Sequence, residues 1–215
     1  MSPVRNNYIH ECLKISNGMR TLVVATKNEK KLHELKRYLR TARADVVSLK
    51  KFQKIPRIVE DKSTFKGNAA KKAIIVSAFV KGLAIADDSG LCVEALSGSP
   101  GVKSARFAGL AKNDKANNRK VLDLLGDRAR SGRKARFVCA VCIADNGKVM
   151  KVIEEDCKGL IAFEPKGRYG FGYDPIFLIP KYDKTFGQLG LKVKDRMSHR
   201  SKALKKARAF LKKYL

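Results

Sequence analysis

A short hydrophobic run followed at once by a helical pattern restricts the fold of this chain more than any other feature of its sequence. Residues 20–26, RTLVVAT, are typical of a buried strand. In the segment KNEKKLHELKRYLR that follows, the spacing of Leu32, Leu35 and Leu39 places three leucines on one face of a helix. A strand, a turn and a helix in this order form the repeating unit of α/β proteins, so we expect that fold class.

The same alternation continues toward the C-terminus. We expect a short strand over 45–50, a helix capped by Ser63 or Thr64, and a strand over 83–91 that runs into a turn. The later pattern predicts a helix near 117–126, strands over 135–144 and 148–159 joined by an Asn146–Gly147 hairpin, and a last helix from Ser198 with Leu204, Ala207, Leu211 and Leu215 facing inward. The helix after Thr64 carries its apolar face on Phe65, Ala69, Ala73, Val76 and Val80.

Length and hydrophobicity set the number of domains. With 215 residues, 44% of them hydrophobic, the chain is long enough for one large domain or two lobes. It has no run of about eighteen apolar residues and no leader typical of secretion, so we expect a cytosolic protein without a membrane span. Residues 1–18 lack periodicity, and we expect them to form an extension that need not be ordered, ahead of a single two-lobed domain over 19–215.

The cysteines favour reduced thiols over a disulfide framework. Their number is odd, five, and they lie in apolar surroundings. Cys139 and Cys142 form a CxxC pattern inside a predicted strand, where residues three apart point to opposite faces. Core packing is therefore favoured over a zinc or redox site at these two positions.

The net charge of +27 predicts attraction to polyanions such as nucleic acids, nucleotides or acidic lipid surfaces. Basic residues are most frequent over 192–213. A dedicated nucleic-acid protein usually adds a recognisable reading element, such as a helix-turn-helix or zinc ligands at fixed spacing, and the sequence contains no such pattern. A solvated basic surface with non-specific polyanion binding is therefore favoured over a DNA or RNA site.

Two polar stretches follow predicted strands. ATKNEKK, residues 25–31, opens a helix, where free backbone N–H groups favour a phosphate, although lysines at a helix start are often only solvated and the P-loop spacing is absent. In ADDSG, residues 86–90, Asp87 and Asp88 point in different directions if the strand persists, one structural and one toward a ligand. An Asx turn explains the same letters equally well.

Three further stretches carry chemistry beyond core packing. Glu60 and Asp61 precede the second helix and offer hard oxygen ligands for a Mg²⁺ that keeps most of its waters. SHR, residues 198–200, lies at a helix start and presents His199 and Arg200 to an anion or a base, unless Ser198 is simply an N-cap. GRYGFGYDPIF, residues 167–177, offers flat rings beside exposed backbone, but alone it suits a tight turn that leads into a buried strand.

Taken together, these stretches resemble one protein family. The chain contains, in order, ATKNEKK, VEDKSTFKGNAAKKA, IADDSGL, GSPGVKSARFAG, GRYGFGYDPIF and KDRMSHRSKAL, which is similar to the inosine triphosphate pyrophosphatase family over about residues 19–211. These XTP/dITP diphosphatases hydrolyse non-standard purine nucleoside triphosphates to the monophosphate and pyrophosphate. The resemblance implies a homodimeric, Mg²⁺-dependent cytoplasmic enzyme with an elongated mixed β-sheet, flanking helices and two lobes around a nucleotide cleft.

The resemblance also implies roles for individual residues. Asp88 is expected to be the general base and a metal ligand, and Glu60 the second metal carboxylate. Phe171 is expected to stack on the purine. The remaining expected substrate contacts are the phosphate-binding turn of Thr26, Lys27, Asn28, Glu29, Lys30 and Lys31, then Lys72 and Ser89, and then Gly172, Tyr173, Asp174, Lys194, His199 and Arg200. A metal and several lysines neutralise triphosphate charge while a carboxylate takes a proton from an attacking water.

The chain departs from the family pattern at three positions. Gly67, Gln188 and Val193 stand where acidic residues are frequent in the family. These changes shift the charge toward positive values, which weakens metal recruitment or strengthens non-specific anion binding. The alternative function is therefore a basic nucleic-acid-binding protein on a repurposed scaffold, but the retention of Glu60 and Asp88 favours the enzyme.

Overall fold

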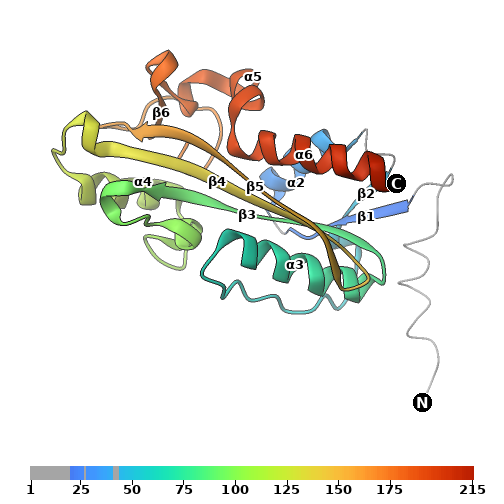
Figure 1. The fold of residues 1–215 in the computed structure, drawn as a ribbon. Helices are drawn as coiled ribbons and strands as arrows, with labels where there is room; N and C mark the ends of the chain where they lie inside the picture. Colours follow the sequence, from blue (N-terminus) through green and yellow to red (C-terminus); the bar gives the residue numbers. More distant parts are fainter. Residues whose placement is uncertain (1–19, 27, 41–43) are drawn as a thin grey trace. The chain divides into compact units, whose positions relative to one another are not determined.

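The computed structural model describes residues 20–26, 28–40 and 44–215 (Figure 1). The expected N-terminal extension over 1–18 lies outside the described residues, and so does Lys27 of the expected phosphate-binding turn. Within the described part of the chain, no helix is long and apolar enough to cross a bilayer.

Within the described residues, seven strands form one mixed sheet, in the order β2-β1-β3-β4-β5-β6-β7. Their bounds are β1 Arg20–Val24, β2 Ala44–Ser48, β3 Leu83–Val93, β4 Lys134–Asp145, β5 Lys148–Ile161, β6 Phe177–Ile179 and β7 Lys184–Thr185. β1 pairs in parallel with β2 and with β3, whereas β6 pairs antiparallel with β5 and β7. The expected α/β class with a mixed sheet is confirmed.

Five α-helices accompany the sheet in the described residues: α2 Glu29–Leu39, α3 Phe65–Val80, α4 Asp114–Leu125, α5 Phe186–Met197 and α6 His199–Tyr214. α2 buries the three predicted leucines, and α3 buries the predicted apolar face with Thr64 as its N-cap. Short 3₁₀ helices cover Leu49–Lys51, Glu94–Leu96, Gly101–Arg106, Arg130–Arg133 and Pro180–Tyr182.

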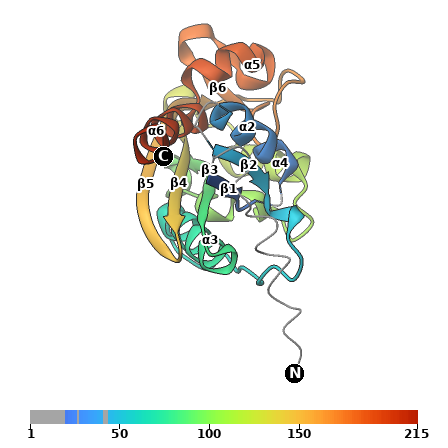
Figure 2. The same ribbon diagram turned by 90° about the vertical axis from the view of Figure 1, so that its right-hand side faces the viewer.

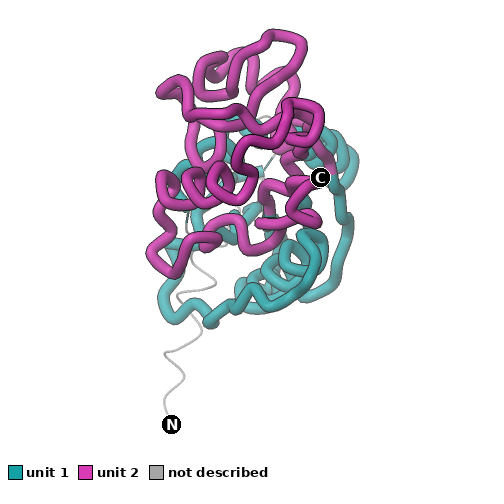
Figure 3. Tube along the Cα trace, turned by 90° about the vertical axis from the view of Figure 1, so that its left-hand side faces the viewer, with its two compact units in different colours: residues 1–88, 140–154, 203–215 teal, residues 89–139, 155–202 magenta. Residues whose placement is uncertain are grey.

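The chain divides into two compact units, coloured in Figure 3. Unit 1 takes the chain up to residue 88, then 140–154 and 203–215, and unit 2 takes 89–139 and 155–202. In unit 1, α3 covers one face of the strands, while α2 and the C-terminal part of α6 cover the other (Figures 1 and 2). The division therefore cuts β3 between Asp88 and Ser89 and cuts α6 after Lys202.

The core of unit 2 contains a cluster of aromatic rings among aliphatic side chains. The ring centroids of Phe137 and Phe177 lie 4.3 Å apart, and those of Phe177 and Phe186 lie 5.6 Å apart. Cys139 of unit 2 and Cys142 of unit 1 are both fully buried in β4, and neither forms a disulfide with another described cysteine, as the core interpretation of the CxxC pattern requires. Burial raises the pKa of the Cys142 thiol to about 11, so it stays protonated at neutral pH.

Three expectations about secondary structure need correction. The strand predicted over 83–91 does not run into a turn at Ser89; β3 continues to Val93 as the hydrogen-bonded neighbour of the long strand β4, beyond its pairing with β1 at Leu83–Ile85. The Asx turn is therefore wrong. Leu215 lies beyond the end of α6 and is only half-buried. The segment over 45–50 leaves the extended conformation after Ser48 and continues as a 3₁₀ turn.

The hairpin predicted between β4 and β5 is confirmed. Asn146 and Gly147 both have positive φ, 47° and 80°, as a type I′ turn requires. The Gly147 N–H donates to the Ser77 hydroxyl at 3.0 Å, which attaches this turn to α3 within unit 1.

Candidate functional site

The side chains of the adjacent Asp87 and Asp88 point to opposite faces of β3, as expected in an uninterrupted strand. Asp87 forms an ion pair with Lys31 of α2, with its Oδ2 2.9 Å from the Lys31 Nζ. Asp88 contacts α3 instead, where Asn68 and Lys72 face it. Each aspartate therefore contacts a different helix, on a different face of the sheet.

Asp88 lies in a compact group of charged and polar atoms. Its Oδ2 accepts a hydrogen bond from Asn68 Nδ2 at 3.1 Å, and its Oδ1 lies 3.8 Å from Lys72 Nζ. The same Nζ lies 2.5 Å from Glu60 Oε1, so the ammonium is flanked by two carboxylates. Asn68 and Lys72 are four residues apart in α3, which places both on one side of the helix.

The group changes the proton affinities of its members. Burial raises the pKa of Asp88, which is 7% exposed, and Glu60 adds to this, while Lys72, Lys31 and the Asn68 amide act in the opposite direction. Burial by itself lowers the pKa of Lys72, but Asp87, Asp88 and Glu60 together raise it above its usual value. Lys72 therefore stays cationic, and Asp88 binds a proton more tightly than an ordinary aspartate.

Asn68 was not among the residues singled out from the sequence. Its Oδ1 accepts from Lys62 N at 2.9 Å, and its Nδ2 donates to Lys62 O at 3.2 Å as well as to Asp88. A Cβ on Gly67 would lie 2.9 Å from the Lys62 Cβ, so the glycine allows the Lys62 segment to pack closely over the helix start. The spacing of Asn68 and Lys72 on one helical face was the available sequence signal.

The expected phosphate-binding turn is a capped helix N-terminus. Asn28 Oδ1 accepts from Lys31 N at 3.2 Å, and Thr26 Oγ1 accepts from Asn28 N at 3.2 Å. Glu29 pairs with Lys50, and Lys30 is exposed. Lys31 is thus directed at Asp87 in this structure.

A second group of site residues lies in unit 2, around the buried carboxylate of Asp174. This residue is 1% exposed and accepts hydrogen bonds from Lys194 Nζ at 2.6 Å and from Phe171 N at 2.8 Å. Burial raises the pKa of Asp174, and Lys194 opposes this. Lys194 Nζ lies 4.7 Å and Arg200 Cζ 5.5 Å from the centroid of the Phe171 ring. Arg200 Nη2 also donates to Ser89 Oγ at 2.8 Å.

The glycines of the 167–177 stretch permit close contacts. A Cβ on Gly170 would lie 2.0 Å from Asp174 Oδ2, and one on Gly167 would lie 2.0 Å from the carbonyl carbon of Gly187. Gly172 has a φ of +64°, which disfavours other residues. The stretch is therefore a tight loop folded around a carboxylate, and it also leads into the buried Ile176 and Phe177 of the alternative interpretation.

Two predicted site residues of unit 2 are directed into its interior. His199 is buried and stacks on Phe137 with 4.7 Å between ring centroids. The Tyr173 hydroxyl donates to Ser104 O at 2.8 Å, and burial raises its pKa. Ser198 Oγ accepts from Ser201 N at 3.2 Å, so it caps the helix that carries His199. Because its hydroxyl is buried and bonded to Ser104, Tyr173 can offer a ligand only its backbone.

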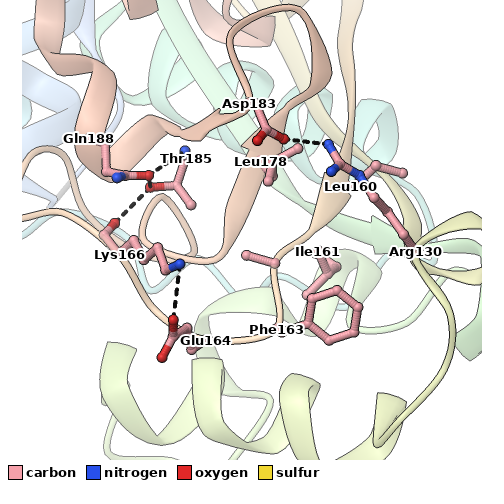
Figure 4. Close-up of a pocket in the computed structure, with 11 residues that line it drawn as sticks. Arg130, Leu160, Ile161, Phe163, Glu164, Lys166, Leu178, Asp183, Thr185 and Gln188 are labelled. Carbon is pink, nitrogen blue, oxygen red and sulfur yellow. Dashed lines mark hydrogen bonds and ion pairs between the residues drawn. The ribbon is translucent and has the colours of Figure 1, made fainter.

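A cavity of about 330 Å³ lies elsewhere in unit 2 (Figure 4). Leu160, Phe163 and Leu178 supply apolar lining, and none of the predicted site residues lines it. Its charged rim is internally paired, since Arg130 binds Asp183 at 2.5 Å and Lys166 binds Glu164 at 3.0 Å. It is not the site that the sequence predicted.

Comparisons with known proteins identify the family. The model of the Ham1 family matches residues 22–210. The chain is 47% identical over 190 residues to the dITP/XTP pyrophosphatase of Desulforamulus reducens, covering 88% of this chain and 94% of the relative. It is 47% identical over 186 residues to the protein of that name from Shouchella clausii, covering 86% and 93%.

A solved structure agrees with these sequence relatives. The Staphylococcus aureus Ham1 protein matches with a TM-score of 0.83 at 37% identity, covering 91% of this chain and 100% of that one. The family resemblance drawn from the six sequence segments is thus confirmed, and the chain belongs to the Ham1 family.

Proposed function

We propose that this protein is a dITP/XTP pyrophosphatase, which hydrolyses non-standard purine nucleoside triphosphates to the monophosphate and pyrophosphate. Two relatives at 47% identity carry that name. The observation that carries the proposal is that the buried Lys72 lies beside two carboxylates, the buried Asp88 and the more exposed Glu60. These relatives favour the enzyme over the nucleic-acid-binding alternative.

Asp88 is the proposed general base. In this step an oxygen of water bonds to the α-phosphorus, the bond from that phosphorus to the α,β-bridging oxygen breaks, and pyrophosphate leaves. The carboxylate of Asp88 takes the proton that the water loses. Its raised pKa makes it a stronger proton acceptor than an ordinary aspartate, and Asn68 fixes one of its two oxygens. Lys72 supplies positive charge where the phosphates carry negative charge.

The carboxylates of unit 1 suit Mg²⁺ as the metal. Glu60 and Asp88 are hard oxygen donors, and the ammonium of Lys72 between them marks a place that favours a cation. Mg²⁺ is commonly held by one or two carboxylates while it keeps several of its waters. Bound there, Mg²⁺ would neutralise triphosphate charge.

Unit 2 supplies the proposed recognition of the base. The Phe171 ring offers a face for a purine, and Lys194 and Arg200 lie near that ring. Hypoxanthine and xanthine carry a keto oxygen at position 6, whereas adenine carries an amino group. An Arg200 N–H can donate to the oxygen and not to the amino group, which favours dITP and XTP over dATP.

The resemblance supports three further parts of the proposal. The catalytic domain is the single domain over 19–215, the enzyme is a homodimer, and it acts in the cytoplasm. The net charge of +27 gives it a general affinity for polyanions in addition to its substrate.

The proposal is tested by incubating the purified chain with Mg²⁺ and dITP, XTP, dATP or dGTP, and by measuring the pyrophosphate and monophosphate that are released. We expect release from dITP and XTP, little from dATP, and none after chelation of the metal. Asp88→Asn serves as the matched control for a contaminating phosphatase. Release of orthophosphate without pyrophosphate, or no release from any substrate, contradicts the proposed function.

A further inference from the structure

Gly172, in the loop that carries Phe171, is held by α4, a helix that contains none of the predicted site residues. Both its N–H and its carbonyl oxygen form hydrogen bonds with side chains of that helix. Asp114 Oδ2 accepts a hydrogen bond from the Gly172 N–H at 2.8 Å. Asn118 Nδ2 donates to the Gly172 carbonyl oxygen at 3.2 Å. Asp114 and Asn118 are four residues apart at the start of α4, so they lie on the same face of that helix.

Neither of these two side chains is the N-cap of α4. The helix already has an N-cap, because Asn113 Oδ1 accepts from Ala116 N at 3.1 Å. Asn117 has other partners, since it accepts from Ala108 N and donates to Ala105 O. The side chains of Asp114 and Asn118 instead form their hydrogen bonds with the Gly172 backbone.

The burial of Asn118 strengthens this view. The residue is 5% exposed, and its Oδ1 is buried without a hydrogen-bond donor among the described residues. Asparagine is also a weak helix former, and a buried amide oxygen without a donor costs free energy. These two unfavourable features of Asn118 are offset only if its Nδ2 group is useful, and that group donates to the Gly172 carbonyl.

The loop would otherwise have considerable freedom at this point. Gly172 has a φ of +64°, and no atom lies within 4 Å of the position of a Cβ. On its other side, Phe171 is fixed by the hydrogen bond from its N–H to Asp174. The ring of Phe171 is thus set by two anchors, Asp174 at its own backbone and α4 at the next residue.

We propose that Asp114 and Asn118 are positioning residues for purine recognition, which hold the Gly172 peptide so that Phe171 is ready to stack on the base. This inference rests on the proposed function of the chain. A loop already fixed in its binding conformation loses less entropy when the ligand binds. The two residues act on Phe171 and not on the phosphates, so they affect nucleotide binding and leave the chemical step unchanged.

Three variants and one control test the proposal in the full chain. Asp114→Ala removes the acceptor, Asp114→Asn keeps one, and Asn118→Leu removes the donor at similar volume. Asn113→Ala is the control, because it weakens the same helix start without touching Gly172. Thermal unfolding confirms that each variant is folded, and Asn118→Leu is expected to keep its stability because it also removes the buried Oδ1.

Two readouts separate positioning from a merely structural role. Hydrogen exchange followed by mass spectrometry reports the Gly172 amide in peptides that span 169–174. Steady-state kinetics with dITP reports KM and kcat. We expect Asp114→Ala and Asn118→Leu to speed exchange in that segment and to raise KM about tenfold, with kcat within about twofold of wild type. Asp114→Asn restores most of the affinity, and Asn113→Ala changes neither readout.

Unchanged exchange in the 169–174 peptides overturns the inference, and so does faster exchange with an unchanged KM. A lowered kcat with an unchanged KM also overturns it. A wild-type chain that hydrolyses neither dITP nor XTP contradicts the proposed function alone. In that case the Kd of dITP decides the inference, since it must rise in both disruptive variants and stay constant in Asn113→Ala.

Discussion

The two groups of site residues are built differently. In unit 1, Asp88 lies in β3 and Lys72 lies in α3, so a strand and a helix position them, while Glu60 comes from the irregular segment before α3. In unit 2, Phe171 lies in a glycine-rich loop, which is held in place by backbone N–H groups that donate to Asp174 and Asp114 and by a carbonyl that accepts from Asn118. In the proposed function, proton transfer therefore depends on residues of a strand and a helix, and base recognition depends on a loop held by individual hydrogen bonds.

This difference predicts which kinetic constant each group controls. Residues that contact the reacting phosphate change kcat, whereas residues that arrange the stacking ring change KM. The following predictions test the division, beginning with the largest expected effect.

Asp88→Asn should lower kcat by at least about a hundredfold while nucleotide binding is retained, because the amide cannot accept the proton of the attacking water. The measurement is pyrophosphate release from dITP at saturating substrate. Asp87→Asn is the matched control at the neighbouring residue. It breaks the buried ion pair with Lys31, so it should lower the free energy of unfolding and change kcat little. Near wild-type turnover of Asp88→Asn contradicts the assignment of the base.

Lys72→Gln should lower kcat by roughly ten- to a hundredfold, on the scale of a lost charge-assisted contact of about 1.5–3 kcal/mol. The lost ammonium leaves Glu60 and Asp88 facing each other without a cation, which raises the pKa of Asp88 further. Lys71→Gln is the control, since Lys71 lies in the same helix but forms its ion pair with Asp61 at the surface. If kcat falls equally in Lys72→Gln and Lys71→Gln, the general surface charge, and not the position of Lys72, is responsible for the fall.

Arg200→Ala should lower kcat/KM for dITP about tenfold and change it much less for dATP, because a donor to the 6-keto oxygen is lost. Lys30→Ala, at the exposed turn of unit 1, should weaken both substrates alike. The ratio of kcat/KM for dITP to that for dATP is the quantity to compare. If Arg200→Ala lowers both substrates equally, Arg200 binds phosphate and the selectivity arises elsewhere.

Asn68→Ala should have the smallest effect, a fall of about threefold at pH 7 that grows as the pH is lowered. Asn68 lowers the pKa of Asp88 through its hydrogen bond, so its loss raises that pKa. Asp88 accepts a proton only when ionised, above its pKa, and the acid limb of kcat/KM therefore moves to higher pH. Thr64→Ala, which removes the cap of the same helix, should leave the limb in place.

The fold was predictable where the hydrophobic pattern is long. α2 and α3 follow directly from the spacing of their buried residues. α5 was missed because Gly187 and Gly190 interrupt its pattern, and Gly190 interrupts the helix itself with φ 70° and ψ 177°. β3 was ended too early because Ser89–Gly90 is typical of a turn, whereas in the sheet β3 stays extended beside β4.

The candidate site was predictable to the extent that its residues stand out as charged or aromatic. The opposite directions of Asp87 and Asp88 followed from strand geometry alone. Asn68, Asp114 and Asn118 were missed because an amide or acid in the first turns of a helix is usually explained by capping. Their partners lie 20, 58 and 54 residues away in the sequence, and only the fold brings them together.

The most direct test of the division is to determine kcat and KM for dITP in Phe171→Ala and Asp88→Asn side by side. Phe171→Ala should raise KM about tenfold, on the scale of a lost base–aromatic stack, and keep kcat within about twofold. Asp88→Asn should do the reverse, with a large fall in kcat at nearly constant KM. If Phe171→Ala instead lowers kcat at constant KM, the loop of unit 2 takes part in the chemical step and the division is wrong.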